Sequence, residues 1–195
     1  IRKWFIYLKN NRTSLLVCYS LYYFLFSIYI IMNCNMTKLK QNDEYYTPQW
    51  VWECLKPYIP NNKIIWEAFC NTDDASRESG KILKNLGFNV ICNGEDFFEN
   101  DYGDIVISNP PYSIKKEVME RLFILEKPFM LILPNIILNT KYFIEWANKD
   151  KDLQIIILPK RVDFIKPQSK KSKCIFHTLV VCWRLNLDDR LTFIS

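Results

Sequence analysis

The chain has a single histidine, His177, and only four glycines among its 195 residues, and both scarcities limit its chemistry. His177 lies in an apolar run, and no acidic cluster at ligand spacing accompanies it, so we predict no metal site. We expect His177 to be a structural strand residue and not a catalyst. Cys70, Asn71 and Thr72 follow the first expected strand, and Gly80 comes only later. Glycine, which lets a backbone approach a ligand most closely, is therefore missing from that loop.

The seven cysteines form no C-x-x-C pair, and their odd number excludes a fully paired disulfide framework. Several lie in apolar runs that are typical of buried strands. We therefore expect reduced thiols in a reducing compartment, which indicates a cytoplasmic protein. The cysteines are Cys18, Cys34, Cys54, Cys70, Cys92, Cys174 and Cys182.

The length and the 49% hydrophobic content allow one ordinary core and exclude two full domains. Residues 13–32 carry no charge and are numerous enough to cross a bilayer. The chain begins with Ile1, and Met32 and Met36 stand just before a polar stretch. We expect residues 1–35 to be untranslated upstream sequence or unstructured rather than a membrane segment, and a membrane partner only if residues 13–32 are translated. The globular domain then comprises residues 36–195.

The formal net charge of +5 at pH 7 is unevenly distributed. The first twelve residues carry basic side chains and no acid, so the chain from residue 36 onward is nearly neutral. Within it, the segment 160–173 contains only one acid, Asp163. This segment is either a phosphate contact or a solvated surface loop, and both interpretations stay open. Its basic residues, the candidate nucleic-acid contacts, are Lys160, Arg161, Lys166, Lys170, Lys171 and Lys173.

Short apolar runs alternate with helical patterns from residue 45 onward, which indicates an α/β fold with a parallel sheet. Asp73 and Asp74 are expected to cap one helix that ends at Gly87, and Ser113 is expected to cap the next. A third helix is expected at 142–147. Strands are expected at 63–67, 88–92, 104–108, 129–133, 153–158 and 174–183.

The tetrapeptide Asn109-Pro110-Pro111-Tyr112 follows the apolar run 105–107 and is the strongest functional signal. An exocyclic amine of adenine, or a glutamine amide, is a poor nucleophile because its lone pair is delocalised. The Asn109 side-chain oxygen and the Pro110 carbonyl can each accept a hydrogen bond from such an amine and draw its nitrogen towards tetrahedral geometry. The prolines remove backbone donors, and Tyr112 offers a ring on which a base taken out of its duplex can stack. We predict that all four residues are catalytic; the alternative is a plain proline-rich turn.

Ligands of open parallel sheets bind beyond the carboxyl ends of the strands, near the point where the strand order reverses. The segment 66–71 ends the first expected strand, and Asn109-Pro110-Pro111-Tyr112 ends a later one. We therefore expect these two segments to lie at the same edge of the sheet.

Taken together, these residues resemble the S-adenosylmethionine-dependent DNA adenine-N6 methyltransferases, most closely the short phage and large-virus type, over about residues 44–183. In that family a Y-T-P segment before the first strand helps to hold the methionine part of the cofactor, and Tyr46-Thr47-Pro48 is similar to it. Glu67-Ala68-Phe69, with Cys70 after it, resembles the loop whose Phe packs on the cofactor and whose acid and backbone orient its polar groups. The resemblance implies a Rossmann-like class I methyltransferase fold, with a mostly parallel sheet and helices on both faces.

Three further segments are part of the resemblance. Asp96-Phe97 is similar to an Asp-Phe pair that contacts the cofactor adenine. Residues 104–112 resemble the catalytic strand and loop of the family, and residues 161–167 resemble a basic R-x-x-F stretch before the last strand. The chain departs from the family in its glycine-free first loop and at Asn93, where an acid is usual. It also has no room for a separate target-recognition domain.

We expect S-adenosylmethionine-dependent methyl transfer to the N6 amine of adenine in DNA, by in-line displacement on the sulfonium. The same tetrapeptide serves enzymes that methylate adenine in RNA or glutamine in proteins, so these acceptors stay open. A degenerate methyltransferase fold that only binds nucleic acid is the interpretation from another class, because the first loop has no glycine. The sequence indicates neither a recognition sequence nor an oligomeric state.

Overall fold

The computed structural model describes residues 46–70, 78–165 and 177–195. The chain divides into two compact units, Ile1–Lys38 and Leu39–Ser195, and the described residues all belong to the second. The expected extension 1–35 lies outside them. In the described part of the chain, no helix is long and apolar enough to cross a membrane.

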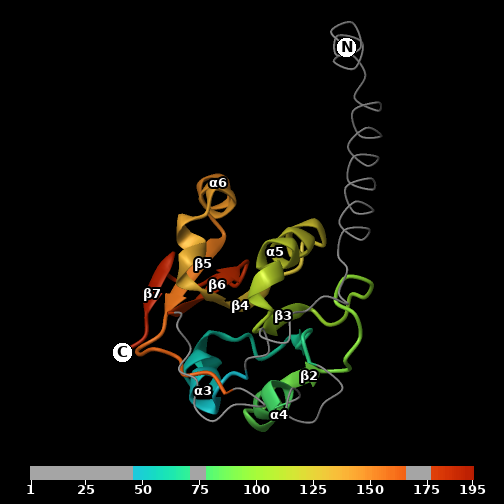
Figure 1. The fold of residues 1–195 in the computed structure, drawn as a ribbon. Coiled ribbons are helices and arrows are strands. Elements are labelled where there is room, and N and C mark those ends of the chain that lie inside the picture. The colour runs from blue at the N-terminus through green and yellow to red at the C-terminus, as the bar shows by residue number, and fades with distance from the viewer. Residues whose placement is uncertain (1–45, 71–77, 166–176) are drawn as a thin grey trace, which may run out of the picture. The chain divides into compact units, whose positions relative to one another are not determined.

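A seven-stranded sheet forms the centre of the second unit, in the order β2-β1-β3-β4-β6-β5-β7 (Figure 1). The strands are β1 Ile64–Trp66, β2 Asn89–Ile91, β3 Ile105–Ser108, β4 Phe129–Pro134, β5 Leu153–Ile157, β6 Thr178–Trp183 and β7 Leu191–Phe193. The α-helices are α3 Gln49–Leu55, α4 Glu78–Asn85, α5 Lys115–Ile124 and α6 Lys141–Lys149. Short 3-10 helices are η2 Lys56–Tyr58, η3 Tyr112–Ile114 and η4 Asn135–Asn139.

The sheet is mostly parallel, because β2, β1, β3 and β4 pair in parallel and β7 pairs in parallel with β5. Strand β6 lies antiparallel between β4 and β5. The strand order reverses between β1 and β3, since β2 lies on one side of β1 and all later strands lie on the other. A ligand crevice is therefore expected beyond the carboxyl ends of β1 and β3.

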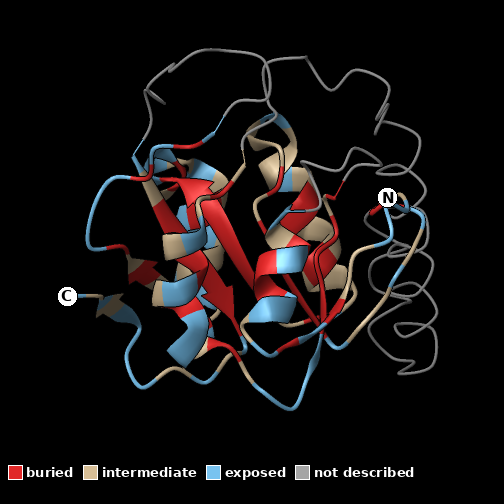
Figure 2. Ribbon diagram, turned by 90° about the horizontal axis from the view of Figure 1, so that it is seen from below, coloured by how far each residue is buried: buried red, intermediate tan, exposed pale blue. Residues whose placement is uncertain are grey.

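Helices cover both faces of the sheet, α3 and α4 on one and α5 and α6 on the other (Figure 1). Side chains alternate between the two faces of the sheet along β3. On one face, Ile105 and Ile107 belong to the core cluster that also contains Trp52 of α3 and Leu83 of α4. On the opposite face, Phe123 of α5 packs edge-on against Trp183 of β6. Most strands are buried between helices that are exposed on their outer sides (Figure 2), and the edge strand β7 is the exposed one. This is the α/β fold that the sequence predicts, with a mostly parallel sheet and helices on both faces.

Most expected elements are present, with ends shifted by a few residues. Gly87 ends α4 with a φ of 99°, as predicted. The predicted cap at Ser113 is wrong, because Ser113 lies within η3 and Ile114 occupies the N-cap position of α5. His177 is exposed and precedes β6, so it is not a residue of that strand. The predicted caps Asp73 and Asp74 lie outside the described residues.

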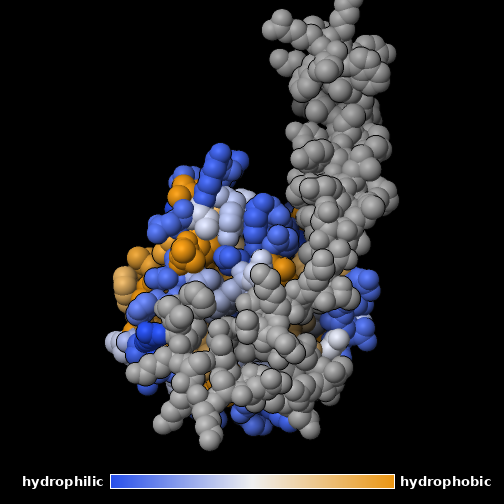
Figure 3. Space-filling model, in the orientation of Figure 1, coloured by the Kyte–Doolittle hydropathy of each residue, from blue (hydrophilic) through white to orange (hydrophobic). Residues whose placement is uncertain are grey.

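Hydrophobic side chains reach the surface near the edge strand β7, where Leu191 and Phe193 are exposed (Figure 3). This edge is far along the sheet from the strand-order reversal, with β4, β6 and β5 between β3 and β7. We therefore treat it separately from the candidate site.

Candidate functional site

The loop Asn109-Pro110-Pro111-Tyr112 leaves the sheet at the carboxyl end of β3, whose four residues are all buried. Pro110 is buried, and the other three residues are half-buried. The Pro111 carbonyl accepts a hydrogen bond from the Ile114 amide (3.2 Å), and Lys115 Nζ donates to the Tyr112 carbonyl (2.9 Å). These bonds fix the turn that leads from β3 into α5.

Phe164, from a segment later in the chain, packs against the Tyr112 side chain. The two rings meet edge-on, with centroids 6.4 Å apart and an interplanar angle of 81°. Phe164 is buried, and such ring pairs contribute about 0.5–1.5 kcal/mol beyond their buried area. The orientation of Tyr112 is therefore linked to the segment 160–165, whose Arg161 and Phe164 belong to the basic R-x-x-F stretch of the resemblance.

A hydrogen bond joins the ends of β1 and β3: Ser108 Oγ donates to Glu67 Oε1. The two segments predicted to meet at one edge of the sheet, 66–71 and 109–112, are thus brought together. Glu67 is 3% exposed, and its Oε2 makes no hydrogen bond of ordinary geometry with the described residues, although the Phe69 amide lies near enough to lower its pKa. Desolvation outweighs the Ser108 and Phe69 contributions and raises the pKa of Glu67 to about 8.

Aromatic rings fill the space behind Glu67. Phe97 is fully buried and packs against Phe69, with centroids 4.9 Å apart, and against Trp66 at 5.5 Å. Phe69 is half-buried, so part of its ring remains accessible. Asp96 Oδ1 accepts a hydrogen bond from the Phe98 amide (2.7 Å), which fixes the turn after β2. Of the two predicted aromatic cofactor contacts, Phe69 is therefore the accessible one, and Phe97 supports it.

The segment Tyr46-Thr47-Pro48 is held against Ile165 by two backbone hydrogen bonds of 2.9 and 3.1 Å between Tyr46 and Ile165. Pro48 occupies the N-cap position of α3. Thr47 is 2% exposed, and its Oγ1 makes no hydrogen bond to the described residues. A buried hydroxyl of this kind is normally paired, so Thr47 offers a donor and an acceptor to a ligand.

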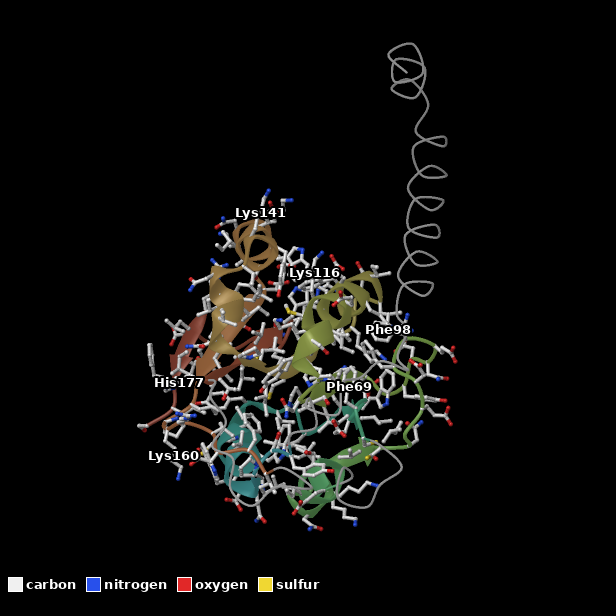
Figure 4. All side chains as sticks on the ribbon, viewed as in Figure 1. Phe69, Phe98, Lys116, Lys141, Lys160 and His177 are labelled. Carbon is white, nitrogen blue, oxygen red and sulfur yellow. The ribbon has the colours of Figure 1, made fainter. Side chains whose placement is uncertain are left out.

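The basic segment is described only as far as residue 165. Lys160 and Arg161 are exposed, and Lys160 Nζ lies 4.6 Å from the centre of the Trp50 ring. Lys160 lies well apart from Phe69 in Figure 4. The other predicted nucleic-acid contacts, Lys166, Lys170, Lys171 and Lys173, lie outside the described residues.

Cys92 was not assigned to the site by the sequence. It follows β2, as Cys70 follows β1, and these strands are parallel neighbours. The thiols of Cys70 and Cys92 and a carboxylate oxygen of Glu67 all lie within 4.8 Å of one another. The only sequence signal for this grouping was that Cys92 ends one expected strand, 88–92, and that Cys70 follows another, 63–67.

The chain was compared with protein-family models, with curated protein sequences and with solved structures, and only the solved structures gave matches. No protein-family model matches it, and no curated protein sequence matches it either. Among solved structures, a candidate RNA methyltransferase from Pyrococcus horikoshii is 17% identical with a TM-score of 0.38, and the match covers 80% of this chain and 94% of the other.

Two more solved structures are similar at the same level. The modification subunit of a candidate type I restriction enzyme from Vibrio vulnificus YJ016 is 15% identical with a TM-score of 0.40, over 90% of this chain and 50% of the other. A methyltransferase from Pyrococcus furiosus is 16% identical with a TM-score of 0.35, over 85% and 98%. Likenesses this distant assign neither an activity nor a substrate to the chain.

Proposed function

We propose that the chain transfers a methyl group from S-adenosylmethionine to the exocyclic N6 amine of adenine in DNA, with residues 36–195 as the catalytic domain. The observation that supports this most is the position of Asn109-Pro110-Pro111-Tyr112 at the carboxyl end of β3, beside the Glu67 end of β1. The proposed acceptor loop is thus next to the strand-order reversal, and sheets of this type bind their ligands there.

The residues around this edge fit a cofactor that has both polar and aromatic parts. Thr47 Oγ1 is a buried polar atom without a hydrogen bond to the described residues, and a polar ligand would pair with it. The half-buried Phe69 ring offers an apolar face. When bound, S-adenosylmethionine supplies the methyl group on its sulfonium. The residues that would hold it are Tyr46, Thr47, Pro48, Glu67, Ala68, Phe69, Cys70, Asp96 and Phe97.

The catalytic loop would act on the acceptor amine by hydrogen bonding and orientation. Asn109 Oδ1 and the Pro110 carbonyl accept one hydrogen bond each from the amine and localise its lone pair. Tyr112 stacks on the base, and Phe164 limits the orientations that the Tyr112 ring adopts. Backbone hydrogen bonds around Pro111 and Tyr112 hold this arrangement before the acceptor binds.

The exposed Lys160 and Arg161 favour a nucleic acid as acceptor over a protein, because phosphates attract such side chains. Adenine in RNA and a protein glutamine amide would use the same loop chemistry. A fold that binds nucleic acid without turnover is favoured by one observation, the presence of Cβ atoms at Ala68 and Cys70, where glycine would allow the closest approach of a cofactor.

The acceptor is tested by offering the full chain labelled S-adenosylmethionine with unmethylated DNA, RNA or protein in parallel. The proposal predicts label in DNA, recovered as N6-methyladenine. Label found only in RNA or protein would contradict DNA as the acceptor and would leave the proposed loop chemistry intact. No label in any acceptor, together with retained DNA binding and no calorimetric signal for the cofactor, would favour the alternative that the chain binds nucleic acid without turnover.

A further inference from the structure

We propose that Glu67, Cys70 and Cys92 form a binding site for a soft divalent cation such as Zn²⁺, at the carboxyl ends of β1 and β2. Their ligand atoms all lie within 4.8 Å of one another. In a tetrahedral zinc site, Zn–S distances of about 2.3 Å and Zn–O distances of about 2.0 Å place neighbouring ligand atoms about 3.5 Å apart. Small side-chain movements are thus enough to bring all three atoms to one ion.

The identity of the ligands selects the kind of metal. Two thiolates and one carboxylate suit zinc, whereas magnesium and calcium prefer oxygen ligands alone. Three protein ligands leave one position of a four-coordinate ion for water or another donor. Binding would require both thiols and the Glu67 carboxyl to lose their protons.

The surroundings of Glu67 support a bound cation. Its carboxyl is 3% exposed, it receives a hydrogen bond from Ser108 at Oε1, and its Oε2 makes no hydrogen bond of ordinary geometry with the described residues. A buried carboxylate is stable when it is paired or coordinates a metal. A divalent ion between Oε2 and the two thiolates would supply both the charge and the missing contact.

The position of Cys92 is fixed by close packing. A Cβ at Gly80 of α4 would come within 2.9 Å of both Cβ and Sγ of Cys92, so only glycine leaves space for this thiol beneath the helix. Cys70 is 4% exposed and Cys92 is half-buried, so the sulfur atoms are shielded and a small ion can still approach. Two loops on neighbouring strands thus present their ligands to the same point.

A cobalt titration of the reduced full chain tests the site, because Co²⁺ replaces Zn²⁺ and its thiolate complexes absorb strongly. We expect one equivalent of Co²⁺ to give thiolate charge-transfer absorption and the visible bands of tetrahedral coordination, and one equivalent of Zn²⁺ to abolish both. The affinity should fall by at least about 100-fold in Cys70→Ser and in Cys92→Ser. The matched control Cys54→Ser changes a cysteine of α3 outside the group and should bind like the unchanged chain.

A second measurement needs no variant and therefore does not depend on how the serine variants fold. One equivalent of Zn²⁺ should slow alkylation of Cys92 and leave the alkylation rate of Cys54 unchanged, as read by peptide mass spectrometry. Absence of cobalt–thiolate absorption, an affinity in both serine variants equal to that of the unchanged chain, or equal protection of Cys54 would each overturn the proposal. A Cys70–Cys92 disulfide, with no cobalt absorption after reduction, would assign the pair to redox chemistry instead. The titration requires neither cofactor nor acceptor, so its result is independent of methyl transfer.

Discussion

Glu67 shows how a single buried residue links two loops of the candidate site. The sequence placed it after the first strand, and the structure adds its hydrogen bond from Ser108, the residue just before Asn109. One hydrogen bond therefore connects the two loops. Burial also raises the pKa of this carboxyl to about 8, so the group is mostly protonated at neutral pH when no metal is present.

The raised pKa of Glu67 predicts the direction in which the stability of the folded chain changes with pH. Between pH 4.5 and about 8 the folded chain retains a proton on Glu67 that the unfolded chain has released. The free energy of unfolding should therefore fall as the pH rises through this range, and Glu67→Gln should remove that part of the decline. Denaturant unfolding at a series of pH values, with a chelator present, measures the difference. Parallel pH profiles for the two proteins would contradict the assignment.

Tyr112 is the residue for which the proposed stacking can be separated from other roles. Tyr112→Phe keeps the ring and should keep most of the activity, whereas Tyr112→Ala should lower kcat/KM for DNA by roughly 10- to 100-fold, since stacking contributes about 1–3 kcal/mol per base. Steady-state kinetics with a short duplex measures both variants. Equal losses in the two variants would point to the hydroxyl and would exclude stacking as the main role of Tyr112.

At the scale of elements, the close approach of α4 to the end of β2 depends on Gly80. Gly80→Ala places a Cβ 2.9 Å from two atoms of Cys92, and we expect a loss of about 1–3 kcal/mol in the free energy of unfolding. Alanine alone would favour the helix by about 1 kcal/mol, so the sign of the change separates packing from helix propensity. Ser79→Ala, the neighbouring position in α4, is the matched control and should change stability little. A stabilised Gly80→Ala variant would show that α4 can move away from β2.

The segment 160–165 is the second element whose role can be measured. Buried Val162 and Phe164 alternate with exposed Arg161, Asp163 and Ile165, so Arg161 points outward while Val162 and Phe164 anchor the segment. Its contact with Tyr46 and with Tyr112 brings it to both predicted binding segments.

We expect a double variant, Lys160→Gln with Arg161→Gln, to weaken DNA binding and to reduce the slope of log affinity against log salt by about 2, one for each lost phosphate contact. Lys141→Gln with Lys149→Gln removes the same charge from α6, where Lys141 lies apart from Lys160 (Figure 4), and should leave the slope unchanged. Fluorescence anisotropy at several salt concentrations gives both slopes. Equal slopes for the two double variants would show that the attraction is not local to residues 160 and 161.

For the whole molecule, the alternation of apolar runs and helical patterns was sufficient to predict the α/β fold and most strands. It could not predict that β6 is antiparallel, because an apolar run buried on both faces has the same pattern in either direction. The elements α3 and β7 were missed. The seven residues of α3 give few helical repeats, and β7 is exposed at Leu191 and Phe193, so it has no buried apolar run of the kind that marked the other strands.

The candidate site was also only partly predictable from the sequence. Asn109-Pro110-Pro111-Tyr112 could be recognised because its chemistry lies in consecutive residues. The contacts of Ser108, Phe164 and Cys92 could not be predicted, because their partners Glu67, Tyr112 and Cys70 come from other strands and loops. Such pairs depend on strand order and register, which one sequence does not specify.

The most direct test of the central claim is the effect of Asn109→Ala on methyl transfer by the full chain. We predict that N6-methyladenine, measured by mass spectrometry of nucleosides from the treated DNA, falls by at least about 100-fold, with cofactor affinity unchanged by calorimetry. Asn148→Ala, which removes an exposed amide from α6, is the matched control and should retain full activity. Methylation by Asn109→Ala at the rate of the unchanged chain would contradict the account.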